Sequence, residues 1–205
     1  MRIFIASSNP GKLREFAEMA APCGVAMELL PRFRHLPEAI EDGETFEENA
    51  RKKSVHYSRF APGELVLVDD SGLSVDALHG EPGVHSARYA ASGTGSGNSG
   101  DEDNNAKLLR ELSGVAMAER TARYVCVVSV ARDGCEIAHF RGESEGVIHD
   151  EARGSGGFGY DPYFYVPALQ KTYAELSPEE KASISHRGAA FRLLLQWCRL
   201  HPEGI

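Results

Sequence analysis

The sequence predicts an α/β fold in which helices cover the faces of a mixed β-sheet. Short apolar runs of strand length alternate with segments whose apolar residues recur every three to four positions. An Asp-Gly pair at residues 133–134 joins two β-rich segments, as in an antiparallel hairpin. A chain of 205 residues that is 42% hydrophobic can bury a sizeable core, so we expect a single domain over residues 1–205.

The chain opens with a predicted strand, a tight turn and a helix. Residues 2–6 are an apolar run, and the helix that follows has Asn9 as its N-cap and Pro10 in its first turn. The face of this helix that we expect to be buried comprises Leu13, Phe16, Ala17 and Ala20.

A second helix is predicted to begin at Thr45, which forms a capping box with Glu48. Residues 65–68 are continuously apolar, which indicates a strand buried on both faces, and this strand is expected to end at Asp69. The predicted stripe of the second helix comprises Phe46, Ala50, Lys53 and Tyr57.

The second half of the chain is expected to add a loop, two helices and three strands. The loop covers residues 92–100, where glycine, serine, threonine and asparagine predominate. Strands are predicted over 124–131, 135–140 and 145–148. The helices are expected to bury Ala106, Leu109 and Leu112 in one case, and Ala190, Leu193, Leu194 and Trp197 after a cap near Ser185 in the other.

The overall charge and the cysteines exclude several classes of protein. A formal net charge of −8 argues against a nucleic-acid-binding surface, which needs a basic face. No apolar run reaches the length of a membrane span, and no export signal is visible, so we expect a cytoplasmic protein. The four cysteines show no paired spacing, so we expect reduced thiols and neither a zinc site nor a disulfide framework.

The turn between the first strand and the first helix is a candidate phosphate-binding site. A helix N-terminus, a glycine that permits close approach and an adjacent lysine suit an anion. An ordinary capped helix start explains the same residues about equally well, and the pattern is not a Walker A loop. The residues concerned are Ser7, Ser8, Asn9, Pro10, Gly11 and Lys12.

A pair of adjacent acids after the apolar strand is a candidate cation site. Asp69 and Asp70 repel each other unless a cation joins them, and alternation along a strand should point only one of them to a given side. Mg²⁺ needs only one or two carboxylates, together with waters and substrate phosphates. Further acids flank the start of the second helix, and a few of them would suffice as ligands: Glu38, Glu41, Asp42, Glu44, Glu47 and Glu48.

Two further segments could contact a nucleotide. In the glycine-rich run 154–162, Phe158 is available to stack on a base, although a glycine-rich turn with core aromatics is the simpler interpretation. Lys181, His186 and Arg187 supply cation-capable groups around the start of the last helix, and these could equally form a surface patch.

Taken together, these motifs resemble the inosine triphosphate pyrophosphatase family, also called the Ham1-like or non-canonical purine NTP pyrophosphatases. Six motifs occur in the family's order across nearly the whole chain. They are residues 7–12 (SSNPGK), Thr45-Phe46 with Asn49-Ala50, 69–73 (DDSGL), 82–89 (PGVHSARY), 156–162 (GGFGYDP) and 183–188 (SISHRG).

The resemblance implies an elongated two-lobed α/β fold around a long mixed sheet, with the nucleotide in the cleft between the lobes and a homodimer as the usual assembly. It implies that Asp70 is the general base and a metal-linked carboxylate, and that Lys12 assists catalysis. It also implies that Glu41 helps to bind Mg²⁺, with Glu38 as a rival in the same acidic run. The residues it places around the substrate are Ser7, Ser8, Asn9, Pro10, Gly11, Lys12, Ser71, Phe158, Gly159, Tyr160, Asp161, Lys181, His186 and Arg187.

The activity implied is hydrolysis of ITP, dITP and XTP to the monophosphate and pyrophosphate. Donors from Lys181, Arg187 or nearby backbone would suit the 6-keto group of these purines and would oppose the amino group of adenine. The base, Asp70, is expected to keep a low pKa close to Mg²⁺. Two alternatives stay open: a Maf-like pyrophosphatase with other nucleotide preferences, and a nucleotide-binding regulator without catalysis.

Overall fold

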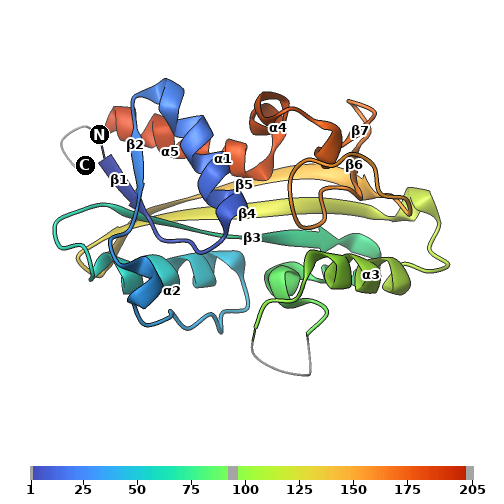
Figure 1. Ribbon diagram of the computed structural model, residues 1–205, viewed down its shortest axis with the longest axis horizontal. Helices are drawn as coiled ribbons and strands as arrows, with labels where there is room; N and C mark the ends of the chain where they lie inside the picture. Colours follow the sequence, from blue (N-terminus) through green and yellow to red (C-terminus); the bar gives the residue numbers. More distant parts are fainter. Residues whose placement is uncertain (1, 92–96, 202–205) are drawn as a thin grey trace. The chain divides into compact units, whose positions relative to one another are not determined.

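The computed structural model describes residues 2–91 and 97–201. Its strands form one mixed seven-stranded sheet in the order β2-β1-β3-β4-β5-β6-β7, in which β1 pairs in parallel with β2 and β3, and β6 pairs antiparallel with β5 and β7 (Figure 1). The predicted α/β class is therefore confirmed. The strands are β1 (Arg2–Ile5), β2 (Ala26–Leu29), β3 (Val66–Val75), β4 (Thr121–Arg132), β5 (Cys135–Ile148), β6 (Phe164–Val166) and β7 (Lys171–Thr172).

Five α-helices and six short 3₁₀ turns connect the strands of the described residues. The helices are α1 (Pro10–Ala20), α2 (Phe46–Ser58), α3 (Asp101–Glu111), α4 (Pro178–Ile184) and α5 (His186–Leu200). The 3₁₀ turns are η1 (Ala21–Cys23), η2 (Phe33–His35), η3 (Asp76–Leu78), η4 (Gly83–Arg88), η5 (Met117–Glu119) and η6 (Tyr173–Glu175).

The chain divides into two compact units. The first comprises the described residues of Met1–Asp70, Cys126–Gly142 and His186–Ile205, and the second comprises those of Ser71–Val125 and Glu143–Ser185. Strands β3, β4 and β5 contribute residues to both units.

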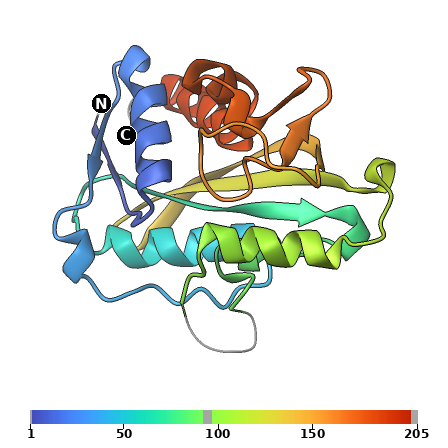
Figure 2. The same cartoon turned by 45° about the vertical axis from the view of Figure 1, so that its right-hand side comes forward.

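In the first unit, apolar cores cover both faces of the sheet. Alternate residues of β1 and β3 point to opposite sides and so enter different cores. Helices α1 and α5 lie on one side of these strands and α2 on the other, as Figures 1 and 2 both show. The cluster with α1 and α5 includes Ile3, Ile5, Leu65, Leu67, Phe16 and Phe191. The cluster on the α2 side includes Phe4, Ala6, Val66, Val68 and Tyr57.

The second unit has its own apolar core. Strand residues Leu73, Tyr124 and Phe164 pack with Leu108 of α3 and with Leu112, the C-cap of that helix. Aromatic rings dominate one part of this core, where Tyr124 stacks on Tyr173 with ring centroids 5.5 Å apart.

Strand β3 is longer than the sequence predicted. We expected it to end at Asp69, but the β-structure continues through Asp69, Asp70 and Ser71 to Val75. The prediction treated charge and glycine as strand breakers. They do not end this strand, because the carboxylates of Asp69 and Asp70 have cationic partners and the apolar pattern resumes at Leu73.

Three helix faces differ in part from the expected ones. Ala17, Ala106 and Leu193 are exposed, although each was predicted to be buried. In α3 the buried stripe contains two polar residues, Asn104 and Asn105, because their side chains bind backbone groups of neighbouring segments. Apolar periodicity alone cannot detect such a stripe.

The hairpin is confirmed, with Asp133 and Gly134 both at positive φ in its two-residue turn. The predicted strand 145–148 is the end of the long strand β5 and not a separate element. At the start of α2 the N-cap is Thr45, but Glu48 accepts a bond from the amide of Glu44, so the predicted reciprocal box is incomplete.

Three other expectations concern the loop 92–100, the cysteines and membrane-spanning helices. Of the predicted loop 92–100, residues 92–96 lie outside the described residues. All four cysteines are free: Cys126 and Cys198 are buried, and Cys23 and Cys135 are exposed. Within the described parts of the chain, we find no helix that combines the length and the apolar character of a membrane span.

Candidate active site

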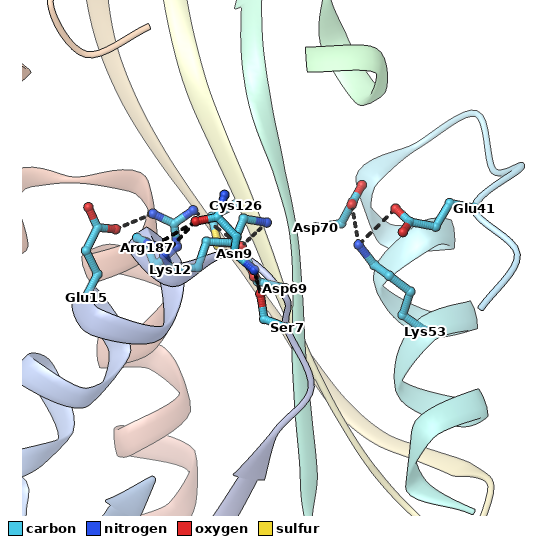
Figure 3. Close-up of polar contacts among 11 residues, drawn as sticks. Ser7, Asn9, Lys12, Glu15, Glu41, Lys53, Asp69, Asp70, Cys126 and Arg187 are labelled. Carbon is cyan, nitrogen blue, oxygen red and sulfur yellow. Dashed lines mark hydrogen bonds and ion pairs between the residues drawn. The ribbon is translucent and has the colours of Figure 1, made fainter. Parts of the chain in front are cut away.

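The two adjacent acids of β3 point to opposite faces of the sheet and meet different partners (Figure 3). Asp69 continues the alternation of Leu65 and Leu67, which face α1 and α5, while Asp70 continues that of Val66 and Val68, which face α2. The expectation that only one of the pair would face a given side is confirmed. Each acid therefore forms ion pairs with different cationic side chains.

Asp69 is the centre of a buried ion-pair network that joins α1 to α5. Its Oδ2 lies 2.9 Å from Lys12 Nζ and 3.4 Å from Arg187 Nη2, and the other terminal nitrogen of Arg187 binds Glu15. Burial opposes ionisation of Asp69, but Lys12 and Arg187 outweigh it and hold the pKa of this carboxyl well below its usual range. Asp69 is thus a permanent anion that fixes Lys12 at the start of α1.

Asp70 shares one cation with Glu41. Lys53 Nζ lies 2.6 Å from Asp70 Oδ1 and 3.1 Å from Glu41 Oε2. Burial alone would lower the pKa of Lys53, yet the carboxylates of Asp70 and Glu41 raise it to about 12. For Asp70 the balance is reversed: burial raises its pKa despite the pull of Lys53 and Lys12. In the protein alone, desolvation therefore outweighs the nearby cations; the low pKa was predicted for Asp70 beside Mg²⁺, and that stays a prediction.

The predicted phosphate-binding turn forms a well-capped helix start. Asn9 is the N-cap, and its Oδ1 accepts the amide hydrogens of Gly11 at 2.8 Å and Lys12 at 3.1 Å. Ser7 Oγ in turn accepts the amide of Asn9 at 3.2 Å. An incoming phosphate would compete with these internal acceptors for the amides, whereas the Lys12 ammonium stands beside them as a charged donor. Ser8 and Pro10 of the same turn are exposed.

In the second unit, Asp161 fixes the glycine-rich turn that carries Phe158. Its Oδ2 accepts the amide of Phe158 at 2.9 Å and the ammonium of Lys181 at 2.6 Å. That ammonium also lies 5.1 Å from the centre of the Phe158 ring. Gly157, at φ +73°, passes so close that a Cβ there would lie 2.0 Å from Asp161 Oδ2, so only glycine fits. The predicted residues Phe158, Asp161 and Lys181 thus form one cluster.

The remaining predicted residues occupy different surroundings. Tyr160 is buried, and its hydroxyl donates to the carbonyl of Ser86 at 2.7 Å, so it anchors the turn. His186 is buried at the first position of α5, while Ser71 is half-buried in β3. The Arg187 guanidinium already binds Glu15 and Asp69, so its predicted role in reading a purine stays a prediction.

The sequence did not predict the roles that three residues have in these clusters. Lys53 had been assigned only to the buried stripe of α2, and a lysine on such a stripe was the available signal. Glu15 gave no signal, since its partner Arg187 is 172 positions away in the sequence. Asp69 was noted only as one of the acidic pair, because nothing local distinguishes it from Asp70.

The carboxylates of Glu41 and Asp70 are a suitable donor set for Mg²⁺. They converge on a single cation, the Lys53 ammonium, so the structure already brings two anionic oxygen groups to one positive charge. Across the described part of the chain, no three His, Cys, Asp or Glu side chains gather as a complete metal cage. A pair of carboxylates is what Mg²⁺ uses when substrate phosphates and water complete its shell.

Comparison with known proteins identifies the family. The model of the Ham1 family matches residues 3–197. The chain belongs to the Ham1 family. Among its relatives, a dITP/XTP pyrophosphatase of Acidobacterium capsulatum is 50% identical over 198 residues, which cover 95% of this chain and 97% of the relative. Another, from Desulforamulus reducens, is 47% identical over 96% of this chain and 94% of the relative.

Solved structures of the family have the same fold. The Ham1 protein of Staphylococcus aureus matches with a TM-score of 0.81 at 42% identity, covering 97% of this chain and 98% of that structure. The HAM1 protein of Coxiella burnetii matches with a TM-score of 0.82 at 38% identity, covering 97% and 98%. The family resemblance seen in the six sequence motifs is therefore confirmed.

Proposed function

We propose that this protein hydrolyses the non-canonical purine nucleoside triphosphates ITP, dITP and XTP to the monophosphate and pyrophosphate, with Mg²⁺ as cofactor. The observation that carries the proposal is the separation of the two β3 acids: Asp69 fixes Lys12, while Asp70 faces Glu41 and Lys53. Asp69 thus positions the cation proposed to bind phosphate, Lys12, while Asp70 is proposed to accept a proton from water. The names of the relatives support the choice of substrates.

The triphosphate is assigned to the first unit. Lys12 would bind the phosphate oxygens, with Ser7, Ser8, Asn9, Pro10 and Gly11 forming the turn around them. Ser71, the β3 residue at which the second unit begins, is also proposed to contact the substrate. As pyrophosphate leaves, negative charge builds up on its oxygens, and the ammonium of Lys12 together with the N-terminus of α1 would stabilise that charge. Asp69 supports this step by keeping Lys12 in place.

Asp70 is assigned as the general base. The water oxygen bonds to the α-phosphorus, the bond from that phosphorus to the bridging oxygen breaks, and the electron pair leaves with pyrophosphate. Asp70 accepts the proton of the water. A carboxylate whose pKa is raised by burial is a better proton acceptor than an exposed one, which suits this role.

Glu41 and Asp70 would hold Mg²⁺, which supplies charge neutralisation for the phosphates and lowers the pKa of bound water. Lys53 occupies the point between these carboxylates in the protein alone. Its ammonium therefore pairs with both acids until the substrate arrives, and it would shift toward the phosphates afterwards.

The purine is assigned to the second unit. Phe158 would stack on the base, and Asp161 orients both Phe158 and Lys181. Lys181 and the backbone amide of Tyr160, which follows Gly159 in the turn, are donors that suit a 6-keto purine and oppose the 6-amino group of adenine. His186 and Arg187, at the start of α5 in the first unit, complete the proposed set of substrate-binding residues.

The proposal treats residues 1–205 as one catalytic domain that works as a homodimer in the cytoplasm, where it removes damaged nucleotides from the pool. The dimer rests on the family resemblance. Size-exclusion chromatography with light scattering would measure a mass of twice 22.3 kDa if the assignment is right, and of 22.3 kDa if it is wrong.

The deciding experiment is a substrate panel of ITP, XTP, dITP, GTP and ATP with Mg²⁺, in which pyrophosphate and orthophosphate are measured separately. We expect pyrophosphate from the first three and little product from GTP or ATP. Comparable turnover of canonical nucleotides would favour a Maf-like enzyme instead. Binding of ITP without turnover would favour a nucleotide-binding regulator.

A further inference from the structure

Helix α3 holds the glycine that follows Phe158 by both of its backbone polar groups. Asp101 Oδ2 accepts the amide hydrogen of Gly159 at 2.7 Å, and Asn105 Nδ2 donates to the Gly159 carbonyl at 3.0 Å. These two side chains are four positions apart in the helix, so they lie on the same face. Together they form a clamp, which we define as Asp101 and Asn105 on Gly159.

Side-chain packing does not fix Gly159, so its position depends on these hydrogen bonds. The residue has φ +63°, in the left-handed region that favours glycine. Apart from Gly159 itself and its two chain neighbours, no described residue has an atom within 4 Å of where a Cβ would be. Its neighbours are anchored independently: the amide of Phe158 donates to Asp161, and the hydroxyl of Tyr160 donates to Ser86. The clamp supplies the third attachment of the turn, next to the proposed stacking ring.

The composition of α3 indicates that the clamp has a specific purpose. Asparagine is a poor helix former, and burying an amide costs free energy unless it forms hydrogen bonds. Nevertheless, Asn104 and Asn105 are both buried in this short helix. Asn104 binds the amide of Ala90 and the carbonyl of Ala87, which fixes the segment after η4, whereas Asn105 reaches the turn at Gly159.

We propose that Asp101 and Asn105 are positioning residues for purine recognition, which act through Gly159 to set the place and tilt of the Phe158 ring. This inference rests on the proposed function. It predicts that the clamp affects binding of the base and leaves binding of the phosphates unchanged, since Lys12 and Asp70 belong to the other unit.

Four variants separate the hydrogen bonds from the charge. Asp101→Ala and Asn105→Ala each remove one arm of the clamp. Asp101→Asn keeps an oxygen that can accept the Gly159 amide but has no charge, so it should recover most of what Asp101→Ala loses. Asp103→Ala is the matched control, because it removes an exposed acid from the same first turn of α3.

For each variant we would measure kcat and KM for ITP, inhibition by tripolyphosphate, and amide hydrogen exchange of residues 154–161 without nucleotide. Loss of one neutral or charge-assisted hydrogen bond should raise KM about three- to tenfold in Asp101→Ala and Asn105→Ala. Exchange in the turn should become faster, while kcat and inhibition by tripolyphosphate stay close to the wild-type values. Asp103→Ala should match the wild type throughout.

Two results would overturn the inference: wild-type KM and exchange in both alanine variants, or an equal loss in Asp103→Ala. Absence of ITP hydrolysis by the wild-type protein would instead contradict the proposed function. The exchange measurement needs no substrate, so it tests the clamp even in that case.

Discussion

The two proposed substrate-binding regions are built by different physical means. In the first unit, buried charges are paired across helices and strand: Glu15, Arg187, Asp69 and Lys12 form one continuous network. In the second unit, the turn that carries Phe158 is held mainly through its backbone amides and carbonyls. The first arrangement suits a highly charged phosphate chain, and the second suits a flat, neutral base.

This difference determines what a substitution should damage. Removing one charge from a buried pair leaves its partner uncompensated, so a change in the first unit should affect charge balance, and therefore the chemical step. Removing a hydrogen bond or a ring from the second unit should weaken binding of the base alone. The following predictions test that contrast.

The largest effect is expected at Asp70. Asp70→Asn keeps the shape of the side chain but removes the proposed proton acceptor, which should lower kcat for ITP about 10²- to 10⁴-fold. Steady-state kinetics with pyrophosphate detection would measure this, and the melting temperature would show that the variant is folded. Near-normal turnover would mean that Asp70 is not the base.

A smaller, purely binding effect is expected at Phe158. Base stacking on an aromatic side chain is worth about 1–3 kcal/mol, so Phe158→Ala should raise KM for ITP roughly 5- to 140-fold. Inhibition by tripolyphosphate, which has no base, should not change. If KM and tripolyphosphate inhibition worsened together, the assignment of base and phosphates to different units would be wrong.

The smallest effect is expected at Glu15, which contacts the proposed machinery only through Arg187. Without this anion, Arg187 should draw Asp69 away from Lys12, so we expect Glu15→Gln to lower kcat/KM about three- to tenfold through misplacement of Lys12. Glu18→Gln is the matched control, since Glu18 is an exposed acid on the same helix.

The two variants would be compared by kcat/KM and then combined with Lys12→Met. If Glu15 acts through Lys12, Glu15→Gln should have little further effect when Lys12 is already methionine. Additive losses would show that Glu15 acts by another route.

The sequence predicted the fold well wherever a local pattern determines the structure. The hairpin at Asp133-Gly134 and the capped start of α1 at Asn9 follow from short-range chemistry, and both are confirmed. The predicted end of β3 was wrong. Cationic side chains of α1 and α2 compensate the charges of Asp69 and Asp70, so the strand continues through both acids. No local window of sequence contains those partners.

The proposed site divides in the same way. The sequence motifs predicted three residues of the site, Asp70, Glu41 and Lys12. The structure adds the residues with which they form ion pairs. Glu15 and Asn105 could not be inferred, since each contacts a segment distant in the sequence. The role of a buried polar residue such as Asn105 can be assigned only when the group that it binds is known.

The extension of β3 through both acids has a consequence for how the family can vary in length. Inserting or deleting one residue in the stretch 65–68 would shift the register and turn every later side chain of the strand to the other face. Asp70, the proposed general base, would then face Lys12 and Arg187, and Asp69 would face Lys53. Length changes should therefore be tolerated in the loops of this fold but eliminated by selection in these few positions.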